Sequence, residues 1–249
     1  MKTRLLLVIL AVATLGALAV ASFRSADAAD TEHLRSAPPV SPTVSPPPPA
    51  QAVTEPHTPA PVPPRGTGVF QKDQTLGRLL GTAGQLRRFH IAVESTVANE
   101  LPEFTRVVDE TLGDRHSWIA DRRHRFQHVP GAVAADFTIY LATRETAYRL
   151  CRAGGVNIRV GGVPYTSCRR TGAVVINLDR WRLSVPSYLD AGIPIATYRA
   201  YVINHEVGHE LGHGHEGCPH VGGPAPVMLT QTLGLRGCTA NPWPYPART

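Results

Sequence analysis

The chain has 249 residues, of which 43% are hydrophobic and 18% charged, and its formal net charge at pH 7 is +6. This length supports one medium-sized domain with appendages and does not comfortably accommodate two separate cores. Only two of the 25 basic residues are lysine, and no basic segment is interleaved with aromatic residues, so we expect no nucleic-acid partner. The positive charge predicts either a solvated arginine-rich surface or contact with anionic cell-envelope polymers.

Residues 1–28 have the pattern of a signal peptide. Lys2 and Arg4 precede an apolar run of 16 residues, Leu5 to Val20, which is shorter than the roughly 20 residues that span a bilayer. Small residues follow in A-x-A form at 26–28. We expect cleavage, and the alternative is an uncleaved N-terminal anchor that would be the chain's one membrane contact. Both interpretations place the domain outside the cytoplasm, secreted or in the cell envelope.

A proline-rich segment follows. The 27 residues from Pro38 to Pro64 contain 12 prolines. Such a segment cannot form a hydrogen-bonded ladder or bury a core, and it is typical of an extended, partly stiff linker. We therefore expect residues 29–65 to be a disordered linker and residues 66–249 to form a single domain.

Within that domain, strands and helices are predicted from the spacing of apolar residues. Apolar alternation and β-rich runs predict strands at 88–93, 125–129, 137–141 and 173–178. Helical spacing, with Pro102 placed to start a helix and Gly113 to stop one, predicts helices at 102–113, 144–152 and 194–212. Asn177 and Asp179 are expected to form a turn. This order of elements, with an irregular Gly- and Pro-rich tail, predicts an α+β fold.

All four cysteines lie in the predicted domain: Cys151, Cys168, Cys218 and Cys238. An even number in an exported chain predicts disulfides, and four cysteines allow three pairings. We expect Cys151–Cys168 and Cys218–Cys238, because each closes a short loop rich in turn residues. A cysteine-ligated zinc site is the weaker alternative, since the chain has no C-x-x-C pair.

The segment from His205 to His215 carries the chemistry. It opens with H-E-x-x-H, and on a helix the histidines at i and i+4 share one face, so both imidazoles can reach one metal ion. Glu206 is displaced from that face but close enough to act on a water at the ion. The sequence therefore predicts His205 and His209 as metal ligands and Glu206 as the general base.

A third ligand must come from beyond the helix. On an unbroken helix His213 would lie about 12 Å along the axis from His205, too far to share one ion. Gly212 and Gly214 are suited to end the helix, because glycine adopts left-handed conformations at low cost. We therefore expect His215 to complete the site.

The other candidates for the third ligand are His213, His220 and Glu216. A class of zinc peptidase that takes its third ligand from a later glutamate is disfavoured here, because no Asp or Glu follows Glu216. Three histidine ligands favour Zn²⁺, although other divalent metals fit such a site.

This segment resembles the metzincin signature H-E-x-x-H-x-x-G-x-x-H, matched at His205, Glu206, His209, Gly212 and His215. Metzincins also place a methionine turn below the metal, and Met228 follows 13 residues after His215. Ordinary core packing is the alternative for Met228. Two residues later, where some metzincins carry a tyrosine that assists the transition state, this chain has Thr230. Tyr245 is a remote candidate for that role, and a turn or core-packing role is the favoured alternative.

The domain is also similar to a family of secreted bacterial metzincin-like proteins of uncharacterised function, in which the stretch Gly162–Cys168 and the final helix recur. The resemblance to metzincins implies a mixed twisted sheet, a long active-site helix and an irregular C-terminal subdomain. It also implies a secreted zinc metallopeptidase that hydrolyses peptide bonds in peptides or proteins with zinc-activated water and Glu206 as general base. The alternatives are a zinc amidase acting on cell-wall peptides and a zinc-bearing envelope module with little turnover.

Overall fold

The structure, a computed structural model, describes residues 61–246. The expected signal peptide (1–28) and most of the expected linker (29–60) lie outside the described residues. Between residues 61 and 246, no helix combines the length and the apolar character needed to cross a membrane.

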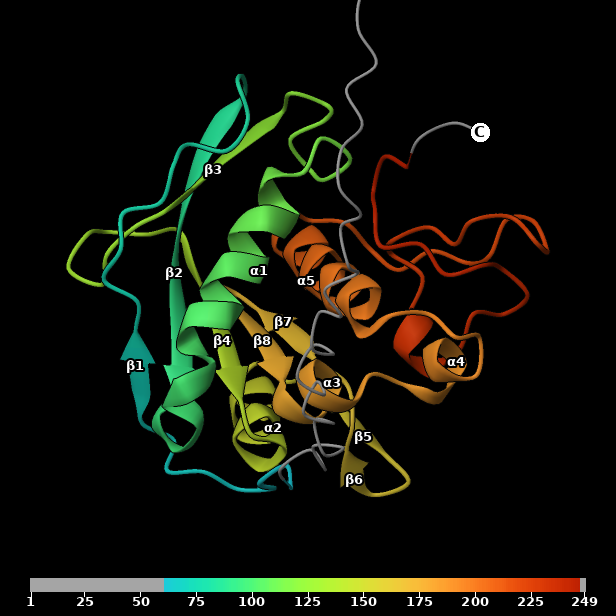
Figure 1. Cartoon of the computed structure of the whole chain (residues 1–249), viewed down its shortest axis with the longest axis horizontal. Coiled ribbons are helices and arrows are strands. Elements are labelled where there is room, and N and C mark those ends of the chain that lie inside the picture. Colours follow the sequence, from blue (N-terminus) through green and yellow to red (C-terminus); the bar gives the residue numbers. More distant parts are fainter. Residues whose placement is uncertain (1–60, 247–249) are drawn as a thin grey trace, which may run out of the picture. The chain divides into compact units, whose positions relative to one another are not determined.

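Residues 61–246 fold around a mixed six-stranded sheet (Figure 1). Its strands are β1 (Phe70–Lys72), β2 (Gln85–Glu94), β3 (His124–His128), β4 (Phe137–Ala142), β7 (Cys168–Arg170) and β8 (Ala173–Asn177). The order is β1-β2-β4-β8-β7, and β3 pairs with the first half of β2. Strands β2, β3, β4 and β8 are parallel, whereas β1 and the edge strand β7 are antiparallel to their neighbours.

Helices cover both faces of this sheet. They are α1 (Leu101–Gly113), α2 (Arg144–Ala153), α3 (Leu178–Leu183), α4 (Pro186–Leu189) and α5 (Ile195–Glu210), with 3-10 turns at Ser95–Glu100 and Gln231–Leu233. Helices α1 and α5 lie side by side over one face (Figure 1). A small separate hairpin, β5 (Arg159–Val160) and β6 (Val163–Pro164), extends from the chain between α2 and β7.

The alternation of side chains along β8 explains the layers, because successive residues of a strand point to opposite faces. Val174 and Ile176 belong to the large core that α1 and α5 cover. Val175 belongs to a second, smaller core with Ala147 and Cys151 of α2. The domain therefore has three layers, with α1 and α5 on one face of the sheet and α2 on the other.

Every strand and helix expected from the sequence is present, with boundaries that differ by a few residues, and the α+β class is confirmed. Strands β1, β5, β6 and β7 and helices α3 and α4 were not expected. Asn177 forms no simple turn. Its side chain accepts a hydrogen bond from the Asp179 backbone N–H at 3.0 Å and caps the start of α3, the preferred role of Asn at a helix N-terminus.

Both expected disulfides are present. Cys151 of α2 is bonded to Cys168 of β7, and Cys218 is bonded to Cys238 within the C-terminal tail. The first bond ties the sheet edge to the helix behind it. Disulfides persist in oxidising compartments, so the two bonds indicate an extracytoplasmic protein.

Asp109 on α1 makes a testable contribution to stability. Burial and the nearby carboxylate of Asp73 raise the pKa of Asp109 from the usual 3.8 to about 6, while the positive charge of Arg78 acts in the opposite direction. Oδ2 of Asp109 lies 3.9 Å from Nδ1 of the buried His128. A raised carboxyl pKa means that the folded state disfavours ionisation, so stability is lost as the pH rises from about 4 through 6. We expect Asp109→Asn to be more stable than the parent above pH 6.

That advantage of Asp109→Asn should shrink steadily as the pH falls from 6 towards 4, and it should vanish only below about pH 3, where the carboxyl is protonated in both the folded and the unfolded chain. Urea unfolding between pH 4 and 8 measures the difference. The matched control is Asp190→Asn, which removes an exposed carboxylate. A constant difference across the pH range would contradict this account of Asp109.

Candidate metal centre

Helix α5 ends where the candidate ligands require it to end. Gly212 has a φ of +95°, a left-handed conformation that glycine adopts without strain. The backbone N–H of His213 donates to the Gly208 carbonyl at 2.9 Å and that of Gly212 to the His209 carbonyl at 3.1 Å. This pair of bonds is the Schellman motif. It confirms the expected helix end at Gly212 and turns the following chain away from the helix axis.

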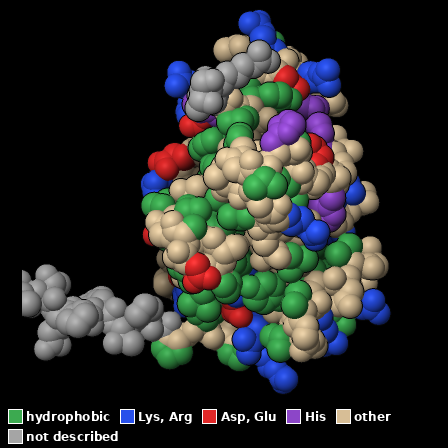
Figure 2. Space-filling view, turned by 90° about the vertical axis from the view of Figure 1, so that its right-hand side faces the viewer, with side chains coloured by type: hydrophobic (Ala, Val, Ile, Leu, Met, Phe, Trp, Pro, Cys, Tyr) green, Lys and Arg blue, Asp and Glu red, His purple; other side chains and the backbone are tan. Residues whose placement is uncertain are grey.

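The turn brings His215 back to the helix. The ligand atoms of His205, His209 and His215 all lie within 4.8 Å of one another, and Nε2 of His209 is 3.0 Å from Nε2 of His215. Histidine side chains gather in one part of the face shown in Figure 2. The structure therefore brings together the three histidines that the sequence singled out as ligands.

Two backbone carbonyls orient the helical histidines. Nδ1 of His205 donates to the Val227 carbonyl at 2.8 Å, and Nδ1 of His209 donates to the His213 carbonyl at 2.8 Å. Because Nδ1 carries the proton in each neutral ring, the lone pair lies on Nε2. Burial lowers the pKa of His205 to about 3, although the bond to Val227 opposes this, and burial also lowers the pKa of His209. Both rings are thus held neutral, the form that binds a metal ion.

Glu206 lies in the same cleft as the histidines. The residue is 5% exposed, and burial raises the pKa of its carboxyl to about 8. A cation close to a buried carboxyl favours the ionised form. Next to His205 in the chain there is therefore a carboxyl group that burial keeps protonated and that a nearby cation would ionise.

The side chains of the site are suited to bind a divalent metal such as zinc. Zinc is bound by imidazole nitrogens at about 2.0–2.1 Å in tetrahedral geometry, which separates neighbouring nitrogens by about 3.3 Å. The 3.0 Å between the Nε2 atoms of His209 and His215 is close to that separation. Three clustered imidazoles, two of them with the tautomer fixed by a backbone carbonyl, are a typical zinc donor set. His205, His209 and His215 would hold the ion and leave a fourth position open to the cleft.

Met228 lies under this part of α5. It is 1% exposed, and a Cβ atom at Gly208 would meet its Sδ at 2.5 Å and Cζ2 of Trp118 at 2.6 Å. Both side chains therefore pack directly against the helix backbone, and only glycine fits at position 208. The indole of Trp118 also donates to the Asn204 carbonyl at 2.9 Å, which anchors the helix just before His205.

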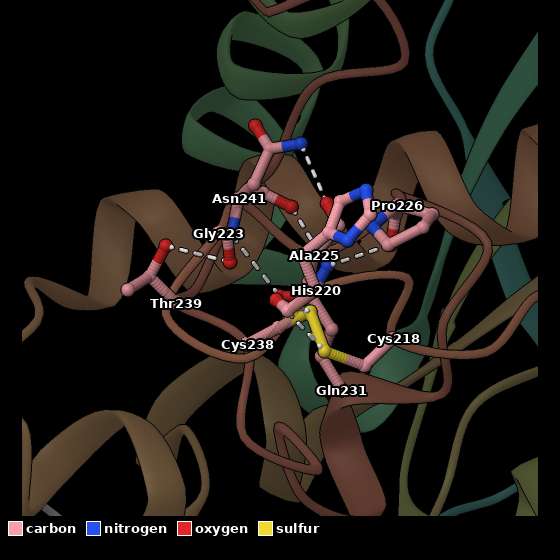
Figure 3. Close-up of a disulfide and its surroundings, with 9 residues drawn as sticks. All are labelled: Cys218, His220, Gly223, Ala225, Pro226, Gln231, Cys238, Thr239 and Asn241. Carbon is pink, nitrogen blue, oxygen red and sulfur yellow. Dashed lines mark hydrogen bonds between the residues drawn. A yellow bond between two sulfur atoms is a disulfide. The ribbon is translucent and has the colours of Figure 1, made fainter.

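Buried amides hold the tail that carries Met228 (Figure 3). The Asn241 side chain donates to the Ala225 carbonyl at 2.8 Å. Gln231 donates to the carbonyls of Pro226 and Asn241 at 3.3 and 2.7 Å, and it accepts from the Tyr188 hydroxyl at 2.7 Å. The disulfide Cys218–Cys238 closes the same loop. This network fixes the Val227 carbonyl, which in turn orients His205.

A cleft of about 710 Å³ opens beside the histidines, within the range of ligand pockets. The edge strand β7 and the β5–β6 hairpin form one side, where Ile158, Arg159, Val160, Ser167, Cys168 and Arg169 line it. Thr230, Thr232 and Leu233 line it from the segment after Met228. The second backbone edge of β7 pairs with no strand of the described sheet, so an extended peptide placed in the cleft can hydrogen-bond to it.

The remaining candidates lie outside the cluster of His205, His209 and His215, although His213 lines the same cleft. His213 stacks on Trp118 with ring centres 4.4 Å apart, and neither His220 nor Glu216 belongs to the histidine cluster. Tyr245 donates to Asp121 at 2.9 Å and does not line the cleft. Sequence reasoning missed Trp118 and the ion pairs of Glu210, because these contacts join segments far apart in the chain.

The fold and the site define an extracytoplasmic α+β domain in which three histidines and a glutamate share one cleft. The chain belongs to the family described as "Protein of unknown function (DUF3152)", whose model matches residues 57–246. No curated protein and no solved structure matches the chain.

Proposed function

We propose that the protein is a zinc-dependent peptidase of the metzincin type that acts outside the cytoplasm. The observation that carries the proposal is the meeting of His205, His209 and His215 with Glu206 in a single cleft. The helix end at Gly212 and Met228 beneath the helix support the metzincin comparison. Imidazoles held in the ligating tautomer and a buried carboxyl in one cleft are together what metal-assisted hydrolysis needs.

In the proposed hydrolysis, the residues of the cleft have separate roles. Zinc, when bound, polarises the substrate carbonyl and makes water acidic enough to attack at neutral pH. Glu206 accepts the proton of the attacking water and delivers it to the leaving amine nitrogen. The carbonyls of Val227 and His213 keep the imidazoles of His205 and His209 in the ligating tautomer. The free edge of β7 positions the peptide backbone beside them.

The proposal is tested with the purified full-length chain and a mixed peptide library, with bound metal quantified by emission spectrometry. We expect about one zinc per chain and cleavage of library peptides that stops when a chelator removes the metal. A folded chain that binds no zinc would overturn the proposal. A zinc-loaded chain that cleaves no peptide but hydrolyses cell-wall fragments would replace the peptidase with an amidase.

A further inference from the structure

The charges around the cleft are unbalanced. Two arginines line it, Arg159 of β5 and Arg169 of β7, and we call this pair the basic rim. Among the residues that line the cleft, Glu206 is the one carboxylate, and the proposed reaction uses it as a base. The exposed Glu216 follows His215 in the chain but does not line the cleft. Figure 2 shows basic side chains close to the histidines on this face.

Arg169 is held in place without being fully neutralised. Its Nε donates to Glu210 at 2.7 Å, and Arg87 donates to the other oxygen of the same carboxylate at 3.4 Å. Two guanidinium groups thus share one carboxylate that is 6% exposed, so the group keeps one net positive charge. The side chain of Arg169 remains 30% exposed, which leaves part of its guanidinium open to the cleft.

Arg159 has no acidic partner in the described part of the chain. Its guanidinium carbon lies 3.8 Å from the ring centre of Tyr148, and no carboxylate of residues 61–246 is within ion-pair distance. Stacking on an aromatic ring orients a guanidinium while its N–H donors stay available at the edge of the plane. Arg159 is therefore preorganised and unpaired at the mouth of the cleft.

We propose that the basic rim, Arg159 above all, selects peptides that carry a carboxylate side chain close to the bond to be cleaved. The inference rests on the proposed function, since it assumes that the cleft receives a peptide. A planar guanidinium binds a carboxylate through two parallel hydrogen bonds. A divalent metal held by the three imidazoles would add further positive charge, so an acidic peptide is attracted and a basic one is repelled.

The test uses eight-residue fluorescent peptides in which one Glu is moved along a neutral sequence, each matched with a Gln peptide. The full-length chain should cleave the best Glu peptide about fivefold faster, in kcat/KM, than its Gln partner at low salt, the size expected for an exposed ion pair. Arg159→Gln should bring the ratio of Glu-peptide to Gln-peptide kcat/KM close to one, and this ratio within one variant does not depend on the variant's overall rate. The matched control, Arg106→Gln, removes an exposed arginine of α1 that does not line the cleft.

Two results separate this inference from the proposed function. Equal cleavage of every Glu and Gln pair, unchanged in Arg159→Gln, overturns the acidic preference and leaves the peptidase intact. If no peptide is cleaved, fluorescence anisotropy measures binding of the same peptides. Tighter binding of the Glu peptides that is lost in Arg159→Gln supports the basic rim and counts against the peptidase. Equal binding of both peptide types overturns the inference.

Discussion

Glu206→Gln should lower kcat/KM for library peptides by at least about 100-fold, the lower end of what general acid–base groups contribute, while zinc stays bound. Gln has nearly the shape of the carboxylic acid but cannot accept the proton of the attacking water. The proposed metal ligands are His205, His209 and His215, and none of their hydrogen bonds in the structure involves the side chain of Glu206. The substitution therefore separates proton transfer from metal binding.

The matched control for this prediction is Glu216→Gln, which removes an exposed carboxylate next to His215 in the chain. It should retain the parent's activity and zinc content, because within residues 61–246 Glu216 hydrogen-bonds only through its backbone N–H, which donates to the Met228 carbonyl at 3.0 Å. Turnover at the parent's rate in Glu206→Gln would remove Glu206 from the mechanism. Loss of zinc in that variant would instead make its carboxylate part of the metal site.

The sequence predicts the local geometry of the site well, because that geometry depends on neighbouring residues. The i, i+4 spacing of His205 and His209 and the glycine at 212 are read along one segment, and the structure agrees with both. Helix α5 lacks the exposed face of an ordinary surface helix along this stretch, since every residue from Ala200 to Gly208 is buried. Apolar periodicity carries less information where a helix is enclosed on all sides, so the i, i+4 histidines add support to the helix that apolar spacing predicts at 194–212.

The sequence could not predict the cleft wall. Strand β7 has three residues, and β5 and β6 have two each, too few to show an alternating pattern. The pairing of Arg169 with Glu210 spans 41 residues and that of Arg87 with Glu210 spans 123. Such contacts follow from the sheet order, which places β7 at an edge beside α5. The residues that we propose to select the substrate are therefore visible only once the fold is known.

At Gly208, local sequence and tertiary structure give opposite predictions for the effect of a substitution on stability. Within a helix, Ala is more favourable than Gly by roughly 0.8–1 kcal/mol, so propensity alone predicts that Gly208→Ala stabilises the protein. The structure places Met228 Sδ 2.5 Å and Trp118 Cζ2 2.6 Å from the position of the added Cβ. Forcing an extra methyl group into a packed core costs about 1–3 kcal/mol.

We expect the clash to exceed the propensity gain, so Gly208→Ala should lower Tm by about 2–6 °C in thermal unfolding of the chelator-treated chain. Zinc affinity should fall as well, because a shift of Met228 moves the Val227 carbonyl that orients His205, and outer contacts of this kind tune metal affinity. Competition with a chelating dye measures that change. Gly217→Ala is the control, since nothing lies within 4 Å of its added Cβ. A Gly208→Ala protein with an equal or higher Tm and the parent's zinc affinity would show that Met228 and Trp118 do not brace the helix beneath the histidines.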